Sequence, residues 1–395
     1  MPAGDVIRLV PGLAWLNAKR RAFEVEHRYS TLSRSYERVA EVPEFAQLWA
    51  RSKLSALRLS PRPRILYCGT DPLQDYGGFI QALAKRCDLR LLKRGDGAYG
   101  QQVDGVAWQE NATALAETLS RLQIEGWRPE IVLMQSMGLR FHPLDLKALK
   151  AKYGFAVINI GMDERLAYSL RIQGGVELGI SGLNEVVDLA LVTAPEAVRW
   201  YARDGVPAKY FPLASNSDIY YPLPTATKLY DVGFIGRAYG RRVRLAERIT
   251  QSGLSFAGRG PGWEGGTLPV EENNEFYGRC RIVLGTGNIG HSQRLMNPKL
   301  RDFEVPLTAV PYITNYTSEL ASLYVENSEI VLYRNEGDLL KKLRWLVGDA
   351  GKAEEIGLAG YRRALSTHTY ERRFEILFDR ILRGDSVAEF VKEGG

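Results

Sequence analysis

The residues best suited to chemistry lie in the C-terminal half of the chain, where arginines and glycines follow a short apolar run. Gly236 and Arg237 come directly after residues 231–235, and Arg241 and Arg242 follow a few positions later. A glycine lets a ligand approach the backbone, and nearby arginines can hold a diphosphate through charge-assisted, often paired hydrogen bonds. Because Gly-Arg pairs are also common in solvated turns, this pattern alone leaves both interpretations open.

A second feature suited to binding an anion lies further along the same half. Asn297, Pro298 and Lys299 predict a helix start, with asparagine as the N-cap and proline at the first helical position. A helix N-terminus with a lysine in its first turn attracts anions. Glu304 follows in this predicted helix, where its carboxylate could accept hydrogen bonds from ribose hydroxyls. The alternative for Glu304 is an ion-paired glutamate on the helix surface.

Residues 285–290 match the pattern G-x-G-x-x-G after a predicted strand. The residues that follow do not begin an amphipathic helix, so we interpret the segment as a flexible glycine loop lining a cleft and not as a dinucleotide site. His291 lies in this loop and is a candidate base, although a single histidine is more often a bystander. We interpret His368 as a packing and capping residue at the start of the last helix.

The elements that must position these residues form two blocks in which short apolar runs alternate with amphipathic segments. This alternation predicts two consecutive doubly wound α/β domains. Ligands bind beyond the carboxyl ends of the strands in such sheets, so we expect two Rossmann-like domains that face each other across a cleft. The predicted strands cover residues 64–68, 89–92, 131–134, 156–160, 189–193 and 210–213 in the first block, and 231–235, 254–257, 281–284, 310–314 and 330–333 in the second.

The boundaries follow from prolines and from changes in pattern. Residues 1–60 predict a helical N-terminal extension, residues 61–222 the first domain, and residues 223–368 the second domain. Residues 369–395 predict a C-terminal helix that crosses back to the first domain.

Composition excludes several classes of protein. The 395 residues carry three cysteines and four histidines with no metal-ligand spacing, which argues against a disulfide framework and a histidine-built metal site. No apolar run reaches the roughly 20 residues that span a bilayer, and the N-terminus lacks the order of a signal peptide, so we expect a cytoplasmic protein. Residues 1–64 hold twelve Lys and Arg against six Asp and Glu, which accounts for the net charge of +6.

That basic surplus has two interpretations. A solvated helical face is the plainer one, and peripheral contact of residues 1–60 with an anionic inner-membrane surface is the other. We expect no nucleic-acid partner, because the surplus is small and no recognised binding motif accompanies it.

The second block resembles the CgeB-type bacterial glycosyltransferases. The similarity is clearest over residues 230–380 and fainter over residues 64–220, and residues 1–58 match nothing in that family. The matching segments are residues 297–306 (NPKLRDFEVP), 311–314 (PYIT), 319–320 (EL), 329–333 (EIVLY), 359–361 (AGY) and 368–370 (HTY) with Arg373, and, more faintly, 158–163 (INIGMD) and 188–193 (DLALVT).

The resemblance implies a GT-B fold and transfer of a sugar from a nucleotide sugar such as a UDP-sugar, without a cofactor or a bound metal. It implies that Glu304 contacts the donor ribose, while Arg237 and either Arg241 or Arg242 hold the diphosphate. The related larger group often has another glutamate eight positions earlier, close to the sugar, but this chain has Met296 there. The residue that contacts the sugar, and the stereochemical course, therefore stay open.

In the GT-B interpretation, the first domain faces the acceptor. Gly77 and Gly78 open the helix after the first strand, and Gln135 and Ser136 follow the third strand, so we expect all four to line the acceptor side. Asp163 follows the next strand. It is our candidate for the base that removes the acceptor proton if the enzyme inverts configuration, and its alternative is a helix-capping or structural aspartate.

Three functions remain open from the sequence. The leading one is a glycosyltransferase that acts on a glycan, lipid-linked sugar or protein acceptor, in keeping with the family's part in polysaccharide biosynthesis at the cell envelope. A nucleotide-sugar epimerase of the same fold would use the donor pocket without an acceptor. A non-catalytic nucleotide-binding module is the third.

Overall fold

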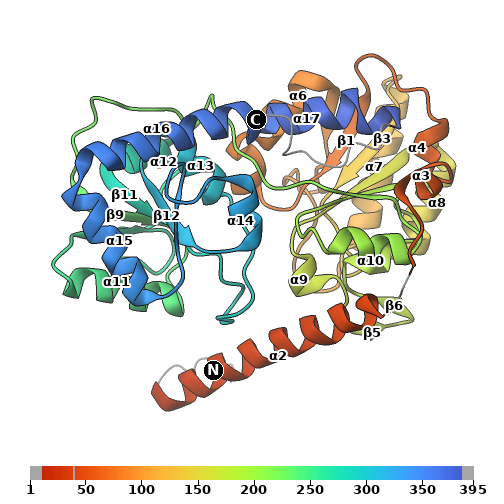
Figure 1. Ribbon diagram of the computed structural model, residues 1–395. Helices are drawn as coiled ribbons and strands as arrows, with labels where there is room; N and C mark the ends of the chain where they lie inside the picture. The colour runs from red at the N-terminus through yellow and green to blue at the C-terminus, as the bar shows by residue number, and fades with distance from the viewer. Residues whose placement is uncertain (1–10, 39–40, 385–395) are drawn as a thin grey trace. The chain divides into compact units, whose positions relative to one another are not determined.

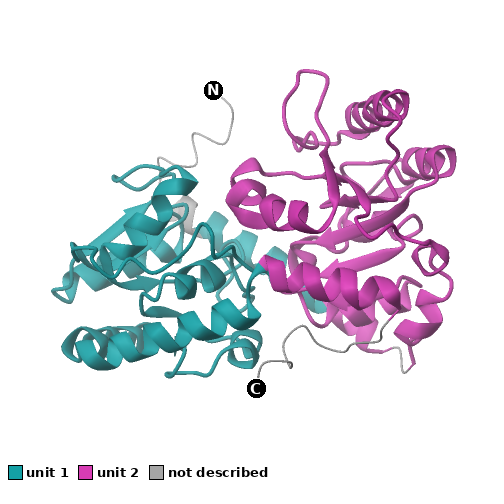
Figure 2. Ribbon diagram, turned by 90° about the horizontal axis from the view of Figure 1, so that it is seen from above, with its two compact units in different colours: residues 1–30, 213–369, 394 teal, residues 31–212, 370–393, 395 magenta. Residues whose placement is uncertain are grey.

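The computed structural model describes residues 11–38 and 41–384. The chain forms two compact units, shown in different colours in Figure 2. Among the described residues, unit 1 takes in residues 11–30 and 213–369, and unit 2 takes in residues 31–38, 41–212 and 370–384. Each unit therefore contains more than one stretch of the chain.

Unit 2 is built on a parallel sheet with the strand order β2-β1-β3-β4-β7-β8. The register pairs Ile65 with both Leu89 and Ile131. All four residues of β3 are buried, as expected for a strand covered on both faces. The strands are β1 (Arg64–Cys68), β2 (Asp88–Leu91), β3 (Ile131–Met134), β4 (Ala156–Gly161), β7 (Leu189–Val192) and β8 (Ala208–Tyr210), and a separate hairpin joins β5 (Ile172–Gln173) to β6 (Val176–Glu177).

The helices of unit 2 have clear local start and stop signals. In α8, His142 accepts from the backbone of the first turn, Pro143 follows it, and Gly154 ends the helix in the left-handed conformation. The larger helices are α6 (Ile80–Arg86), α7 (Trp108–Ile124), α8 (Pro143–Tyr153), α10 (Ala197–Arg203) and α17 (Tyr370–Asp379), and the short ones are α3 (Phe45–Trp49), α4 (Lys53–Ala56), α5 (Pro72–Gln74), the π-helical η2 (Asp75–Phe79), α9 (Glu164–Ala167), η3 (Ile180–Leu183) and η4 (Ile381–Arg383).

The last long helix, α17, packs in unit 2 although it comes at the end of the chain. The ring of Phe79 meets those of Tyr370 and Phe374 edge-on, with centroids 5.2 and 5.1 Å apart. These aromatic contacts fix α17 against the segment that follows β1.

The N-terminal helix α2 (Pro11–Glu37) contributes residues to both units. Its last turn contacts unit 2, where Tyr36 donates to Asp204 over 3.0 Å. Asp204 also accepts a 2.7 Å hydrogen bond from Tyr168, and the Arg203 guanidinium lies 4.3 Å from the Tyr36 ring centre. The end of α2 is thus fixed by hydrogen bonding to the exposed Asp204 carboxylate and by a cation–π contact.

Unit 1 contains a second parallel sheet with the order β10-β9-β11-β12-β13. Val232 of β9, the second strand in this order, pairs with Phe256 on one side and Ile282 on the other. The strands are β9 (Tyr230–Ile235), β10 (Phe256–Arg259), β11 (Cys280–Leu284), β12 (Tyr312–Asn315) and β13 (Val331–Tyr333).

Helices cover both faces of this sheet, with α11 and α15 on one face and α12, α13 and α16 on the other (Figure 1). The core between α11, α15 and the sheet includes Phe234, Leu245, Ile282 and Leu343, each at most 1% exposed. The helices are α11 (Arg241–Gln251), α12 (Val270–Gly278), α13 (Arg301–Leu307), α14 (Ser318–Leu323), α15 (Glu336–Gly348) and α16 (Ala350–Thr367).

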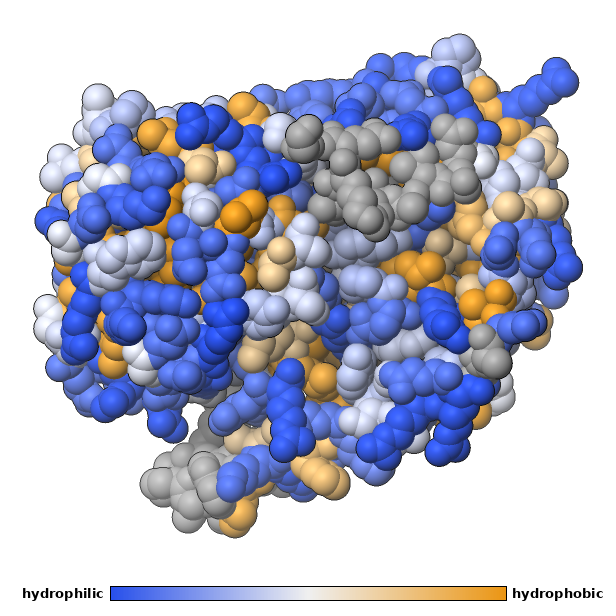
Figure 3. Space-filling view, viewed as in Figure 1, coloured by the Kyte–Doolittle hydropathy of each residue, from blue (hydrophilic) through white to orange (hydrophobic). Residues whose placement is uncertain are grey.

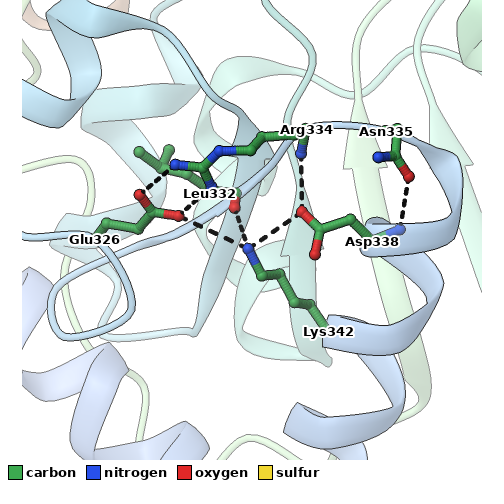
Figure 4. A network of polar contacts seen from close by, with 6 residues as sticks. All are labelled: Glu326, Leu332, Arg334, Asn335, Asp338 and Lys342. Atoms are coloured by element: carbon green, nitrogen blue, oxygen red, sulfur yellow. Dashed lines mark hydrogen bonds and ion pairs between the residues drawn. The ribbon is translucent and has the colours of Figure 1, made fainter.

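A polar network fixes the turn from β13 into α15 (Figure 4). The Arg334 guanidinium donates to both oxygens of Glu326 over 2.6 and 2.9 Å, and its backbone donates to Asp338. Lys342 reaches Asp338 over 3.2 Å, and Asn335 caps the helix by accepting from the Asp338 backbone. This turn therefore has a defined geometry at the carboxyl edge of the sheet.

On the face of the molecule shown in Figure 3, hydrophobic residues occur in small groups among hydrophilic ones. Within residues 11–38 and 41–384, no helix is both long enough and apolar enough to cross a membrane.

The predicted strands match the observed ones closely, but several boundaries differ. The predicted strand 210–213 is β8 at 208–210, and the hairpin of β5 and β6 was not predicted. The expectation that Gly77 and Gly78 open a helix is wrong. The helical segment already begins at Pro72, capped by Asp71, and the two glycines form a kink in it, with Gly78 at φ 123°.

Candidate functional site

The strand order of unit 1 has a topological switch point at the carboxyl ends of β9 and β11, the place where doubly wound sheets form a ligand crevice. The chain leaves β9 toward β10 on one side and returns to β11 on the other, which is the topology that opens a ligand site in doubly wound sheets. Gly236 follows β9 with φ at 144°, and Gly285 follows β11. A Cβ on Gly285 would lie 1.9 Å from the Tyr312 hydroxyl, so no larger residue fits there.

Two arginines converge on this switch point from different helices. The guanidinium of Arg242, at the start of α11, lies 5.4 Å from the ring centre of Phe234, and that of Arg301, at the start of α13, lies 4.7 Å from the same ring. Arg242 donates through Nε to the Thr286 hydroxyl over 3.1 Å, and Arg301 donates through Nη1 to the Ile235 carbonyl over 2.7 Å. Backbone and ring contacts therefore fix both positive groups.

The two guanidinium groups make no close ion pair with a described carboxylate. Neither forms an ion pair within 4 Å with a carboxylate of residues 11–38 or 41–384. Burial, and then the charge of Arg301, lower the pKa of Arg242 to about 10. The Nε atom of Arg301 is buried and has no hydrogen-bond partner among the described residues. A pair of half-buried cations with unused donors is suited to a polyvalent anion such as a diphosphate.

Glu304 lies one helical turn after Arg301 on α13 and is half-buried. Tyr277 donates to its Oε2 over 3.3 Å. Burial raises the pKa of Glu304 to about 7, although the charge of Arg301 and hydrogen bonds from Tyr277 and Tyr220 oppose the rise. Glu304 thus lies near one of the two cations, and its ionisation is sensitive to any ligand that donates hydrogen bonds to it.

The predicted helix start at Pro298 is wrong. Helix α13 begins at Arg301, and Asn297 and Lys299 lie in the extended segment before it. The Lys299 backbone donates to the Asp302 carboxylate over 2.5 Å, and Tyr312 donates to the same carboxylate over 2.6 Å. The buried Asp302 side chain therefore holds the segment that precedes α13, which has no side-chain cap, and the Asn297 backbone donates to the Gly287 carbonyl over 2.9 Å. Whether Asn297 and Lys299 contact the donor stays a prediction.

The glycine segment 285–290 forms a folded loop and is not followed by a helix until α13. Gly287 donates to the Asn315 side chain over 3.1 Å, and Ile289 donates to the Leu295 carbonyl over 3.0 Å. This geometry differs from that of a dinucleotide-binding turn, in which a helix starts at the glycines. His291 at the end of the segment is half-buried, its ring centroid 5.9 Å from that of Tyr239.

The remaining predicted donor residues differ in how far they are buried. Arg237 is exposed, and its carbonyl accepts from Arg242 over 3.0 Å. Arg241 is half-buried at the first position of α11. The sequence analysis missed Arg301 and Thr286. Arg301 lies in the segment 297–306 that carries the family resemblance. Its place in that segment could have marked it as a candidate binding residue.

The candidate acceptor-side residues belong to unit 2. Gln135 and Ser136 are buried just after β3, where Gln135 donates to the Tyr67 hydroxyl over 2.6 Å and Ser136 donates to Gln101 over 2.8 Å. Both side chains are therefore engaged in a network within the unit. Its centre is Asp75, 0% exposed, a residue that the sequence analysis did not single out.

Asp163 is the N-cap residue of α9, and its side chain makes no capping hydrogen bond to that helix. The neighbouring Glu164 is buried and accepts from the Thr193 backbone over 2.9 Å and from the Thr193 hydroxyl over 2.8 Å. Burial raises the pKa of Glu164 to about 8. Glu164 therefore has a role in the fold, and Asp163 remains the predicted base of this unit.

Comparison with known proteins identifies the region that holds the arginine pair. Residues 241–379 match a family described as glycosyl transferase-like. No curated protein sequence matches the chain. The match covers about a third of the chain, including Arg242, Arg301 and Glu304.

Solved structures resemble most of the chain at low sequence identity. Anabaena Alr3699/HepE in complex with UDP and glucose has a TM-score of 0.59 at 10% identity, covering 80% of this chain and 99% of that chain. Sucrose-phosphate synthase from Thermosynechococcus elongatus has a TM-score of 0.54 at 11% identity, covering 80% and 98%. AviGT4, a glycosyltransferase of avilamycin A biosynthesis, has a TM-score of 0.51 at 14% identity, covering 82% and 98%. These likenesses show the fold, and the expected GT-B class is confirmed.

Proposed function

We propose that the protein is a glycosyltransferase that takes its sugar from a nucleoside diphosphate sugar bound in unit 1. The observation that carries this proposal is the pair of half-buried arginines, Arg242 and Arg301, at the carboxyl ends of β9 and β11. Both lie within the residues that match a glycosyl transferase-like family. The HepE structures contain UDP or UDP-glucose, which makes UDP the first nucleotide to test.

In the proposed complex, each part of the donor has a partner of suitable chemistry. The diphosphate lies against Arg242 and Arg301, and the ribose hydroxyls donate to the ionised Glu304. When the bond between the sugar carbon and the diphosphate oxygen breaks, negative charge grows on that oxygen. Two fixed cations in a half-buried site stabilise this charge more than water does. The arginines would thus bind the donor and also lower the barrier to transfer.

The finer parts of the proposal rest on the resemblance to the CgeB-type family. They are that the reaction needs no metal, and that the acceptor hydroxyl belongs to a glycan, a lipid-linked sugar or a protein. If the enzyme inverts configuration, Asp163 removes the acceptor proton, and His291 is the weaker candidate.

A calorimetric screen tests the proposal directly. The full-length protein is titrated with UDP, GDP, ADP and NAD, each with and without EDTA. We expect one nucleoside diphosphate to bind, with an affinity that EDTA does not change. Binding of NAD alone would contradict the proposal.

Product analysis separates transfer from related reactions. The protein is incubated with the matching nucleotide sugar, with and without a mixture of acceptors. A transferase forms a glycosylated product only when an acceptor is present. An epimerised sugar nucleotide formed from the donor alone would contradict transfer while leaving the donor site valid.

A further inference from the structure

Ser292 is the point at which the N-terminal helix contacts the glycine loop. Its hydroxyl donates to Oε1 of Glu26 on α2 over 2.6 Å, across 266 positions of sequence. The Ser292 hydroxyl oxygen also accepts hydrogen bonds from the backbone amides of Arg294 and Leu295, over 3.1 and 2.9 Å. Ser292 is 2% exposed and Glu26 is half-buried, so this contact is a partly buried, charge-assisted hydrogen bond.

The loop that Ser292 organises begins at the candidate donor site. The Ser292 carbonyl accepts from the Asn288 side chain over 3.0 Å, and Asn297 donates to Gly287 where the loop closes. Thr286, near the start of the loop, accepts from Arg242. A shift of the loop would therefore move the anchor that holds the Arg242 guanidinium.

The helix also reaches the neighbouring loop residue. Burial and the charge of Arg21 on α2 lower the pKa of His291. The His291 ring lies edge-on to Tyr239, and the Tyr239 ring lies 4.5 Å from the Arg242 guanidinium. His291 and Ser292, which are consecutive in the loop, thus each interact with α2 and, through different neighbours, with Arg242.

We infer that Glu26 is a positioning residue for the donor site, which holds the glycine loop so that Arg242 faces the diphosphate. This inference rests on the proposed function. It changes the interpretation of the N-terminal extension, because residues 16–30 then form part of the donor site and are not a separate appendage. Glu26 touches neither the diphosphate nor the reacting atoms, and it acts through Ser292.

Titration of Glu26→Ala with UDP and with uridine tests the inference. Uridine lacks the diphosphate, so its binding does not depend on the position of Arg242. We expect the Kd for UDP to rise roughly three- to tenfold, the effect of one hydrogen bond, while the Kd for uridine stays unchanged. Glu26→Gln keeps an acceptor oxygen for Ser292 and should recover most of the UDP affinity.

Glu24 supplies the matched control on the same helix. Its side chain is about half exposed and, within residues 11–38 and 41–384, forms an ion pair with Arg20 alone over 3.3 Å. Glu24→Ala should leave both affinities unchanged. In a Ser292→Ala background, Glu26→Ala should have no further effect, because the interaction is already lost.

The outcomes separate this inference from the proposed function. If the wild-type protein binds no nucleoside diphosphate, the proposed function fails and the inference fails with it. If the wild type binds UDP but Glu26→Ala binds it equally well, the inference alone is overturned. Equal weakening of UDP and uridine would also overturn it. Amide hydrogen exchange at Arg294 and Leu295, faster in Glu26→Ala than in Glu24→Ala, provides a second measurement of the loop.

Discussion

Arg242 and Arg301 donate to two different oxygens of the same residue, Thr286. Arg242 Nε lies 3.1 Å from its hydroxyl, and Arg301 Nη2 lies 3.4 Å from its carbonyl. Two like charges held at one residue raise the energy of this site, and burial, followed by the charge of Arg301, lowers the pKa of Arg242. A bound polyanion relieves that repulsion, which is why this site is the best candidate for the donor diphosphate.

Replacing either arginine should weaken nucleotide binding. Each guanidinium would make hydrogen bonds to a charged group, worth about 1.5–3 kcal/mol. We therefore expect Arg242→Ala and Arg301→Ala each to raise the Kd for UDP roughly 10- to 100-fold in calorimetry. Arg242→Lys keeps the charge without the forked donors and should fall between wild type and alanine.

Arg244 on the same helix is the control for this pair. It is exposed and contacts Glu336 over 3.2 Å. Arg244→Ala should bind UDP like the wild type. A loss of affinity in Arg244→Ala as large as in Arg242→Ala would indicate a general effect of positive charge and would contradict a built site.

Nucleotide binding should become tighter as the pH rises through about 7. Burial raises the pKa of Glu304 to about 7, so at lower pH this carboxyl carries a proton. Ribose hydroxyls donate better to the ionised form, and binding must then release the proton. Titrations with UDP from pH 5.5 to 8.5 should show this trend.

The β-phosphate of UDP also titrates near this range, so the comparison with Glu304→Gln isolates the contribution of the residue. The variant should bind more weakly at pH 8.5 and show a smaller change in affinity with pH. An identical pH profile in wild type and variant would exclude Glu304 from the ribose site.

Glu164 should make the stability of unit 2 depend on pH. Burial raises its pKa from 4.5 to about 8, so the folded protein holds this proton more tightly than the unfolded chain does. The contribution of Glu164 to stability is therefore full below about pH 4.5 and is lost as the pH rises to about 8. In urea unfolding, Glu164→Gln should lose less stability between pH 5 and pH 8.5 than the wild type.

The control for this measurement is Glu185→Gln. Glu185 lies in the same unit with its side chain 48% exposed, 3.9 Å from Lys147. Its removal should leave the pH dependence of the wild type intact. If Glu164→Gln and the wild type lose stability in parallel, the buried carboxyl does not hold its proton as argued.

Asp75 should be among the most important polar residues for the stability of unit 2. Its carboxylate accepts from Tyr67 over 3.0 Å, Tyr99 over 2.8 Å, and Gln135 and the Thr70 backbone over 3.2 Å each. Asp75→Ala removes the acceptor of the buried Tyr67 hydroxyl and of the partly buried Tyr99 and Thr70 donors, and each buried donor left unpaired costs about 1–3 kcal/mol. We expect a loss of about 3 kcal/mol or more in the free energy of unfolding.

Asp71 provides a comparison four positions away. It is exposed and caps α5 by accepting from the Leu73 backbone over 2.9 Å. Asp71→Ala should cost about 1 kcal/mol, the usual effect of a lost cap. Equal losses for the two variants in urea unfolding would show that the Asp75 network contributes little beyond a local turn.

The amino-acid sequence by itself determined the strands of the two sheets, because short apolar runs that alternate with amphipathic segments predict buried strands. The predicted strands 64–68 and 131–134 match β1 and β3 in full. Gly236, Arg242 and Glu304 could likewise be selected from their residue types and their places after a strand or within a helix.

The tertiary structure alone decided which of these residues meet. Arg301 joins Arg242 because β9 and β11 are neighbours in the sheet, and strand order is not written in any local pattern. The helix begins at Arg301 and not at Pro298, and the buried Asp302 carboxylate on its first turn accepts from the Lys299 backbone that precedes it. The contact between Glu26 and Ser292, which are 266 positions apart, likewise depends on packing between distant elements. Local periodicity encodes elements, whereas contacts between distant side chains depend on how those elements pack.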